Sequence, residues 1–313
     1  MKKITMSKGN EMTLQDGFDK FIQKCKVKNL ASRTQEYYEK EYEHFTRYLN
    51  RNSLLSQIES ETIDNYVLYL RKDTKANDIT IASYMRAIRA IFYYIMKMGY
   101  MERFDITIPK AVKKVKETYT DEELRILLKK PKLNDCSFTE YKTWVYVNYL
   151  LGTGNRVSTV LNLQIKDLDF ENSLIKLTTT KNKKQQIIPM ADSLKSTLIE
   201  FLEYRGGEQD DYVFCTETGR QATVRGIEDN LKIYNRKRGV MKTSSHLFRH
   251  TFAKQWILNG GDIFRLQKML GHSDLTVVKE YVNMFSDDLV MDFNKFNPLD
   301  QMTKPVNRMS MRK

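Results

Sequence analysis

The chain has 313 residues, enough for two domains that each bury a core of their own. Its 52 Lys and Arg residues against 39 Asp and Glu residues give a formal net charge of +13, which favours a polyanion such as nucleic acid as the partner. With 41% hydrophobic residues the chain is too apolar for a disordered basic tail, and it has no run of about 18 apolar residues that would span a membrane.

The N-terminus and the cysteines indicate a reducing compartment. No apolar stretch follows the first basic residues, as a secretory signal would require. The cysteines Cys25, Cys136 and Cys215 are odd in number and far apart, so they fit neither a disulfide framework nor a zinc knuckle. We therefore expect a cytoplasmic protein with three unrelated thiols.

Residues 11–100 show helical periodicity, with four segments that each place apolar side chains on one face. These faces are Phe18, Phe21, Ile22 and Cys25; Tyr38, Tyr42, Phe45 and Leu49; Ile63, Tyr66, Val67 and Leu70; and Tyr84, Ile88, Ile91, Phe92 and Ile95. The aromatic residues fit a core better than a platform for stacking bases. The pattern predicts a small helical bundle over residues 1–105, with charged outer faces that can contact DNA.

An extended, basic segment follows the fourth helix. Pro109 disfavours helix at Ile108, and four lysines follow within residues 110–116. We interpret residues 106–118 as an interdomain linker. A linker that crosses a phosphate backbone and an ordinary solvated linker both fit this composition.

A second domain is predicted over residues 119–300. Thr120 and Glu123 form a capping box at its first helix, and apolar helical segments follow. Residues 168–189 change to the pattern of short strands joined by turns, after which helices return. The fold class is therefore mostly α with a small β-sheet (α+β), and residues 301–313 are expected to form a flexible tail.

Three of the four histidines, His246, His250 and His272, lie in one C-terminal segment, and histidine is well suited to proton transfer near neutral pH. His246 and His250 are four residues apart, as zinc ligands on a helix often are. Arg249 lies between them and would repel a dication, and no Glu occupies the position of a metalloprotease base. The intervening residues therefore disfavour a metal site, and His250 fits a hydrogen bond within its helix.

Six residues stand in short motifs along the second domain: Arg156, Lys181, His246, Arg249, His272 and Tyr281. Arg156 lies in Gly-Thr-Gly-Asn-Arg-Val-Ser, Lys181 in an expected hairpin, and His272 in Leu-Gly-His, nine residues before Tyr281. In this order they resemble the active-site set of the tyrosine recombinases, the family that includes the phage integrases and the Xer recombinases. The resemblance covers nearly the whole chain and implies an N-terminal core-binding bundle followed by a catalytic domain.

The resemblance implies a site-specific recombinase that cleaves and rejoins DNA through a 3′-phosphotyrosine intermediate and a Holliday junction, without metal, ATP or other cofactor. Tyr281 would be the nucleophile. Arg156 and Arg249 would hold the nonbridging oxygens, because planar guanidiniums match phosphate geometry. Lys181 would protonate the leaving 5′ oxygen, and Lys183 would take this role if the register slips by two.

The two remaining residues of the set are histidines. His246 would assist as an acid or base, and His272 would donate to the phosphate. Two positions depart from the pattern of the family. Thr159 stands where an acidic residue is common, and Gln186 stands where the hairpin often has an arginine.

The resemblance also implies partners: double-stranded DNA at specific core sites and a homo-oligomer that is a tetramer on two sites. Accessory proteins are a further candidate partner. Residues 287–296 look like a short amphipathic helix, which either packs on a neighbouring protomer or on its own domain. We expect no extra N-terminal arm-binding domain, a layout that resembles the Xer-like or mobile-element recombinases. The alternatives are a type IB topoisomerase-like activity and a DNA-binding protein of the same fold that has lost catalysis.

Overall fold

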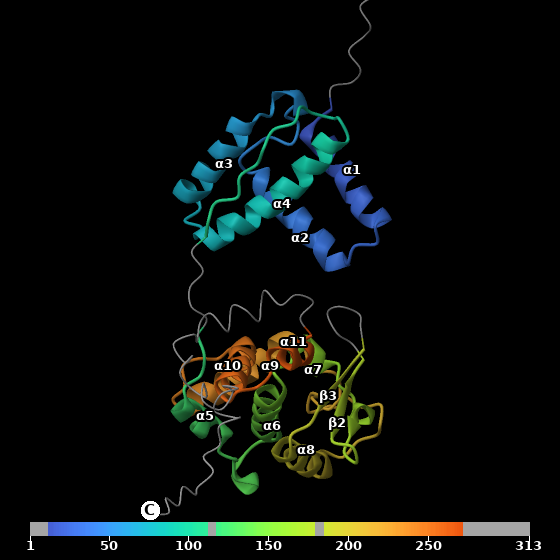
Figure 1. Cartoon of the computed structure of the whole chain (residues 1–313), viewed down its shortest axis with the longest axis vertical. Helices are drawn as coiled ribbons and strands as arrows, with labels where there is room; N and C mark the ends of the chain where they lie inside the picture. The colour runs from blue at the N-terminus through green and yellow to red at the C-terminus, as the bar shows by residue number, and fades with distance from the viewer. Residues whose placement is uncertain (1–11, 112–116, 179–184, 272–313) are drawn as a thin grey trace, which may run out of the picture. The chain divides into compact units, whose positions relative to one another are not determined.

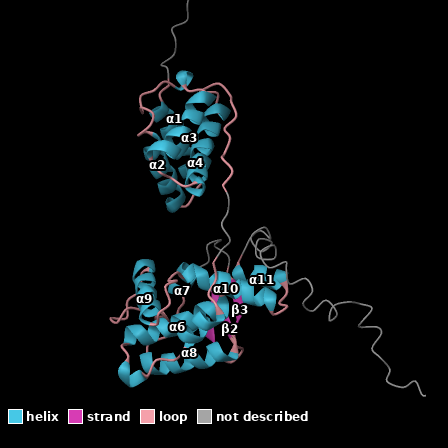
Figure 2. Cartoon of the chain, turned by 90° about the vertical axis from the view of Figure 1, so that its left-hand side faces the viewer, coloured by secondary structure: helices cyan, strands magenta, loops and turns pink. Residues whose placement is uncertain are grey.

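The structure is a computed structural model of the chain, and it describes residues 12–111, 117–178 and 185–271. The chain divides into two compact units, Met1–Lys114 and Val115–Lys313. Helices dominate both units, and all the strands among the described residues belong to the second one (Figures 1 and 2). No described helix is long and apolar enough to cross a bilayer.

The first unit consists of the four predicted helices, with α4 packed against each of the other three. They are α1 (Leu14–Val27), α2 (Ser32–Phe45), α3 (Ser60–Asp73) and α4 (Asp78–Lys97), with a 3-10 turn at Leu55–Gln57. The start of α1 is fixed by a capping box of Thr13 and Asp16. At the start of α4 the side chain of Asn77 accepts a hydrogen bond from the backbone N–H of Thr80.

The core of this unit is aromatic. The ring of Tyr42 stacks on that of Phe18 with 3.7 Å between centroids. Phe45 meets Tyr66 and Phe92 edge-on, at 4.7 and 5.7 Å. All five rings are buried, so the interpretation of these aromatic faces as core is confirmed.

The second unit is built around α6, which is buried along most of its length and contacts α5, α8, α9 and α10 (Figure 1). Its helices are α5 (Asp121–Leu128), α6 (Phe138–Thr153), α7 (Val157–Leu161), α8 (Asp192–Arg205), α9 (Val224–Lys237), α10 (Ser245–Leu258) and α11 (Ile263–Leu270). Two 3-10 turns, Leu133–Asp135 and Ile165–Asp167, lie between them. The predicted capping box of Thr120 and Glu123 opens α5.

A three-stranded antiparallel sheet of order β1-β2-β3 completes this unit. Its strands are β1 (Leu168–Asp169), β2 (Leu174–Leu177) and β3 (Gln186–Pro189), and the last pair of the β2–β3 ladder joins Leu177 to Gln186. Ile175 and Ile188 pair across the ladder and are both buried. The prediction of a mostly α fold with a small β-sheet is confirmed. Lys181, within the β2–β3 connection, lies outside the described residues.

Candidate active site

The first arginine motif is a tight turn between α6 and α7. α6 ends at Gly154 in the left-handed conformation, with φ 62°, and Arg156 is the N-cap residue of α7. Between them, the buried Asn155 donates a hydrogen bond from Nδ2 to the Oη of Tyr149, at 3.0 Å. This bond anchors the turn to α6 and so fixes where the backbone of Arg156 begins.

Gly154 also brings three elements close together. A Cβ placed on it would lie 2.5 Å from Cδ1 of Phe252 on α10 and 2.8 Å from Cδ2 of Leu270 on α11. Both distances are shorter than van der Waals contact allows, and the positive φ is itself unfavourable for other residues. The glycine therefore lets the ends of α6 and α11 approach the same point on α10.

The two arginines meet at this point. Arg249, on α10 and 3% exposed, donates from Nη1 to the carbonyl of Gly154 and from Nη2 to that of Leu270, both at 2.8 Å. Arg156 donates from Nη1 to the same Leu270 carbonyl at 3.4 Å. Two guanidiniums thus share one acceptor oxygen, and folding holds two positive charges side by side.

His246 lies one helical turn before Arg249 on α10, so the two side chains are neighbours on the helix surface. His246 is exposed, whereas His250, one turn further along, is 7% exposed. The two imidazole rings meet edge-on with 4.7 Å between centroids. In the part of the chain that the structure describes, no group of three or more His, Cys, Asp or Glu is placed to hold a metal ion.

The structure therefore brings together Arg156, Arg249 and His246 of the six predicted site residues. Lys181, His272 and Tyr281 lie outside the described residues, as does the expected amphipathic segment 287–296. The described residues end at Gly271, directly after Leu270, whose carbonyl the arginines share. His272 is the next residue in the sequence.

Tyrosines of the second unit that the structure describes are mostly core residues. Tyr146 and Tyr149 on α6 are fully buried, and burial raises the pKa of both phenols far above the usual value. The hydroxyl of Tyr146 lies 2.9 Å from the Oγ of Ser245. Tyr204 is exposed but belongs to α8, which lies on the far side of α6 from α10 in both views (Figures 1 and 2). A neutral, enclosed phenol is a poor nucleophile for an external phosphate.

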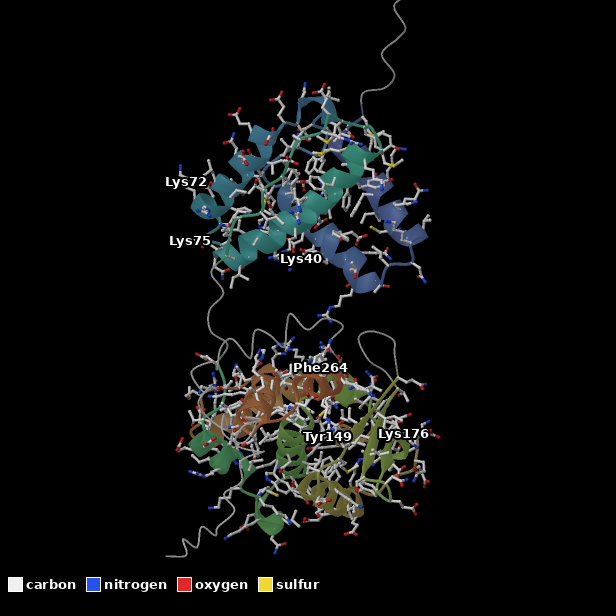
Figure 3. The ribbon with its side chains drawn as sticks, viewed as in Figure 1. Lys40, Lys72, Lys75, Tyr149, Lys176 and Phe264 are labelled. Atoms are coloured by element: carbon white, nitrogen blue, oxygen red, sulfur yellow. The ribbon has the colours of Figure 1, made fainter. Side chains whose placement is uncertain are left out.

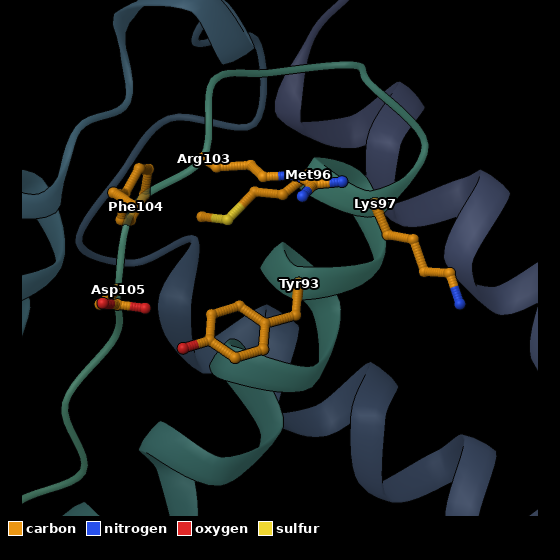
Figure 4. A pocket seen from close by; sticks show the side chains of 6 residues that line it. All are labelled: Tyr93, Met96, Lys97, Arg103, Phe104 and Asp105. Carbon is orange, nitrogen blue, oxygen red and sulfur yellow. The ribbon is translucent and has the colours of Figure 1, made fainter.

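A cavity of about 640 Å³ lies in the first unit, between the C-terminal half of α4 and the segment that follows it (Figure 4). Its lining residues are Tyr93, Met96, Lys97, Arg103, Phe104 and Asp105. The hydroxyl of Tyr93 accepts a hydrogen bond from the backbone N–H of Ile106 at 3.3 Å, so it pins the chain that leaves α4. This cavity lacks the paired guanidiniums and the histidine of the second unit, and we do not assign it to catalysis.

Sequence reasoning missed what holds the arginines in place. The Leu270 and Gly154 carbonyls that accept their hydrogen bonds are backbone groups, which every residue has, so no residue type marked them. The only signal was the pair of glycines in the two motifs, Gly154 and Gly271, both of which cap helices in the left-handed conformation.

Models of known protein families match both units of the chain. The model of the "Phage integrase family" matches residues 117–287, and that of the "Phage integrase SAM-like domain" matches residues 13–115. The chain is 26% identical over 300 residues to tyrosine recombinase XerD of Listeria innocua, covering 91% of this chain and 99% of that protein. It is 24% identical over 294 residues to tyrosine recombinase XerC of Leptospira interrogans, covering 91% and 94%.

Solved structures share the fold. A Tn1549 transposon integrase in complex with transposon right end DNA has a TM-score of 0.73 and 20% identity, with 87% of this chain and 94% of that chain covered. A lambda integrase dimer bound to a core site has a TM-score of 0.69 and 17% identity, with 86% and 95% covered.

Proposed function

The chain belongs to the phage integrase family of tyrosine recombinases, enzymes of site-specific DNA recombination, and from this premise we propose how its residues perform the reaction. The catalytic centre is formed around the end of α11, with Tyr281 as the nucleophile. Arg156 and Arg249 bind the scissile phosphate, Lys181 is the general acid, and His246 and His272 assist. No metal or other cofactor takes part.

The observation that carries this proposal is the shared carbonyl of Leu270. It holds the guanidiniums of Arg156 and Arg249 within hydrogen-bond distance of one oxygen, at 3.4 and 2.8 Å. Two cations held this close favour an anion between or beside them. A phosphate gains negative charge on its nonbridging oxygens as it is attacked, and positive donors fixed in advance stabilise that charge most.

The proposed step conserves the energy of the phosphodiester. The Oη of Tyr281 attacks phosphorus and passes its proton to His246, while the bond from phosphorus to the 5′ oxygen breaks. Lys181 gives a proton to that oxygen, which leaves as a 5′-hydroxyl. The products are a 3′-phosphotyrosine and a free hydroxyl. A hydroxyl from another strand reverses the step, and two rounds of exchange pass through a Holliday junction.

The partner is proposed to be double-stranded DNA at specific core sites. The net charge of +13 and exposed lysines such as Lys40, Lys72 and Lys75 of the first unit (Figure 3) suit phosphate contacts. We assign core-site binding to residues 1–105, the linker to residues 106–118 and catalysis to residues 119–300. A related transposon integrase has been solved in complex with DNA and lambda integrase as a dimer bound to a core site, and we propose a homotetramer on two sites.

The test is a nicked suicide duplex that carries a cognate site obtained by selection from random sequence. The protein is expected to become covalently joined to the 3′ end in the presence of a chelator, and a tryptic phosphopeptide should contain Tyr281. Tyr281→Phe should abolish the adduct and leave binding intact. Tyr204→Phe, at an exposed position on α8, is the matched control and should form the adduct at the wild-type rate.

The other outcomes separate the alternatives. Binding to a selected site without any adduct would mean a DNA-binding protein without catalysis. An adduct on any duplex, with relaxation of supercoils and no strand exchange between two sites, would mean a topoisomerase-like activity. An adduct that persists in Tyr281→Phe would assign the nucleophile to another residue.

A further inference from the structure

The C-terminal turn of α11 is held by side chains from three other elements. The last carbonyls of a helix have no partner within it and are usually taken by water or a cap. Here the Nε2 of Gln186 donates to the carbonyls of Lys268 and Met269, at 2.9 Å for Met269. The next carbonyl, that of Leu270, is the one that the two guanidiniums share.

Gln186 is the first residue of β3 and therefore stands at the base of the β2–β3 hairpin. It pairs with Leu177, the last residue of β2, at the end of the ladder nearest the connection that carries Lys181. Side chains alternate along a strand, and Ile188 is buried while Ile187 is 59% exposed. Gln186 thus points to the same face as Ile188, toward the helices.

Gly271 gives a second indication that this contact is built into the fold. It caps α11 in the left-handed conformation, with φ 61°, and a Cβ placed on it would lie 3.0 Å from the Oε1 of Gln186. The amide of Gln186 therefore packs closely on the residue that directly precedes His272. A larger residue at position 271 would push the glutamine away from the carbonyls that it caps.

We propose that Gln186 is a positioning residue: it ties the base of the hairpin that carries Lys181 to the end of α11, where Arg156 and Arg249 are held. This inference rests on the proposed function, in which Lys181 protonates the leaving oxygen. The strands β2 and β3 lead into the connection that carries Lys181, so holding Gln186 against α11 limits how far the general acid can lie from the two guanidiniums. Small misplacements of a catalytic group are costly in rate.

A glutamine suits this task because its NH2 group supplies two donors for two neighbouring carbonyls. A carboxylate would face the carbonyl oxygens with negative charge and repel them. An arginine would keep donors at the end of a longer side chain. The capping role therefore predicts that Gln186→Arg keeps the wild-type cleavage rate, whereas Gln186→Glu and Gln186→Met cleave more slowly.

The experiment measures single-turnover cleavage at saturating DNA with two suicide duplexes, one natural and one with sulfur in place of the bridging 5′ oxygen. A thiolate leaves without a proton, so the sulfur substrate does not need the general acid. Gln186→Met is expected to cleave the oxygen substrate roughly tenfold or more slowly than wild type, a loss typical of a displaced catalytic group. On the sulfur substrate it should cleave at nearly the wild-type rate.

The ratio of the two rates comes from one protein preparation, so it does not depend on how much of the variant is folded. Gln221→Met is the matched control, because Gln221 also donates from Nε2 to two oxygens, the carbonyl of Leu161 and Oδ1 of Asn162, both at 3.0 Å. It should lose comparable stability and keep the wild-type ratio. Lys181→Met should show the same rescue by sulfur as Gln186→Met.

Two results would overturn the inference while leaving the proposed function standing. Equal slowing of Gln186→Met on both substrates would mean that Gln186 does not act through the leaving group. Wild-type rates on both would mean that the cap has no role in cleavage. If wild type itself formed no adduct with either substrate, or if sulfur did not rescue Lys181→Met, the proposed function would fail first and this inference with it.

Discussion

The two units use their interiors differently. Among the described residues, the first unit buries one polar or charged side chain, Glu41, and the second unit buries eleven. Arg249 of the arginine pair and Asn155, which directly precedes Arg156, are two of the eleven. A buried polar group costs free energy unless it is hydrogen-bonded, so a fold retains many of them only where their bonds are satisfied or useful. The first unit is therefore a packed, almost wholly apolar scaffold, whereas the second unit contains the buried polar groups, among them a member of the arginine pair.

The largest expected effect is on the second unit, from Arg249→Lys. A lysine keeps the charge but cannot donate to the Gly154 and Leu270 carbonyls together or present a planar fork to phosphate. We expect the cleavage rate at saturating DNA to fall roughly 100- to 1000-fold, the loss typical for one transition-state donor. Single-turnover adduct formation on the suicide duplex measures it.

The control is Arg205→Lys, far from the site on α8. Arg205 also donates from Nη1 and Nη2 to two backbone carbonyls, those of Gly206 and Tyr212, at 2.6 and 2.7 Å. If both variants lost cleavage equally, the loss at Arg249 would come from lowered stability alone, and the contrast between the catalytic and the structural interior of the second unit would disappear.

The second largest effect is expected on stability, at Gly154, where α6 comes close to α10 and α11. Gly154→Ala adds a Cβ to a residue with φ 62° and places it within 2.5 Å of Phe252. We expect the free energy of unfolding of the second unit to fall by about 2 to 4 kcal/mol, from left-handed strain together with overpacking. Urea unfolding followed by tryptophan fluorescence measures it, since Trp144 and Trp256, the two tryptophans of the chain, both belong to this unit.

Gly239→Ala separates the two causes. Gly239 has φ 77°, but a Cβ there would meet nothing within 4 Å. It should cost only about 1 kcal/mol, the strain alone. Equal losses in the two variants would mean that α10 and α11 move apart freely, and that the ends of α6 and α11 are not held tightly at the arginines.

The sequence predicted the elements well because their signals are local. The apolar faces of α1 to α4 and the capping box at Thr120 depend on residues within a few positions of one another, and the structure confirms them. The order of the motifs also predicted that Arg156 and Arg249 belong to one site, and the structure brings them to one carbonyl.

The supporting contacts were not predictable because they join side chains to backbone carbonyls that lie far away in the sequence. Gln186 stands 82 and 83 residues before the carbonyls that it caps. In the sequence it stands out only as a departure from the arginine that is common at this position of the family. The buried carboxyl of Glu41 was equally hidden, since a Glu on a helix rich in Glu predicts an exposed face.

The smallest effect is on the first unit, at that one buried charge. Glu41 is 6% exposed, its Oε2 has no hydrogen-bond partner among the described residues, and burial raises its pKa, with Lys40 opposing the shift. Because the folded state holds the proton more tightly than the unfolded state, ionisation of Glu41 destabilises the fold. The penalty is absent below the ordinary pKa of 4.5 and grows as the pH rises toward the raised folded-state value.

Glu41→Gln is therefore expected to stabilise the first unit at pH 7 by about 1 kcal/mol, because the amide has no charge to desolvate, and to change little in acid. Hydrogen exchange of the amides of α1 to α4 measures this unit by itself, while tryptophan fluorescence reports on the second unit, which should not respond. Glu39→Gln, at an exposed position on the same helix, should change stability by less than about 0.5 kcal/mol. A gain from Glu41→Gln that is equally large at acid pH would show that the amide makes new contacts, because a charge penalty must vanish once the carboxyl is protonated.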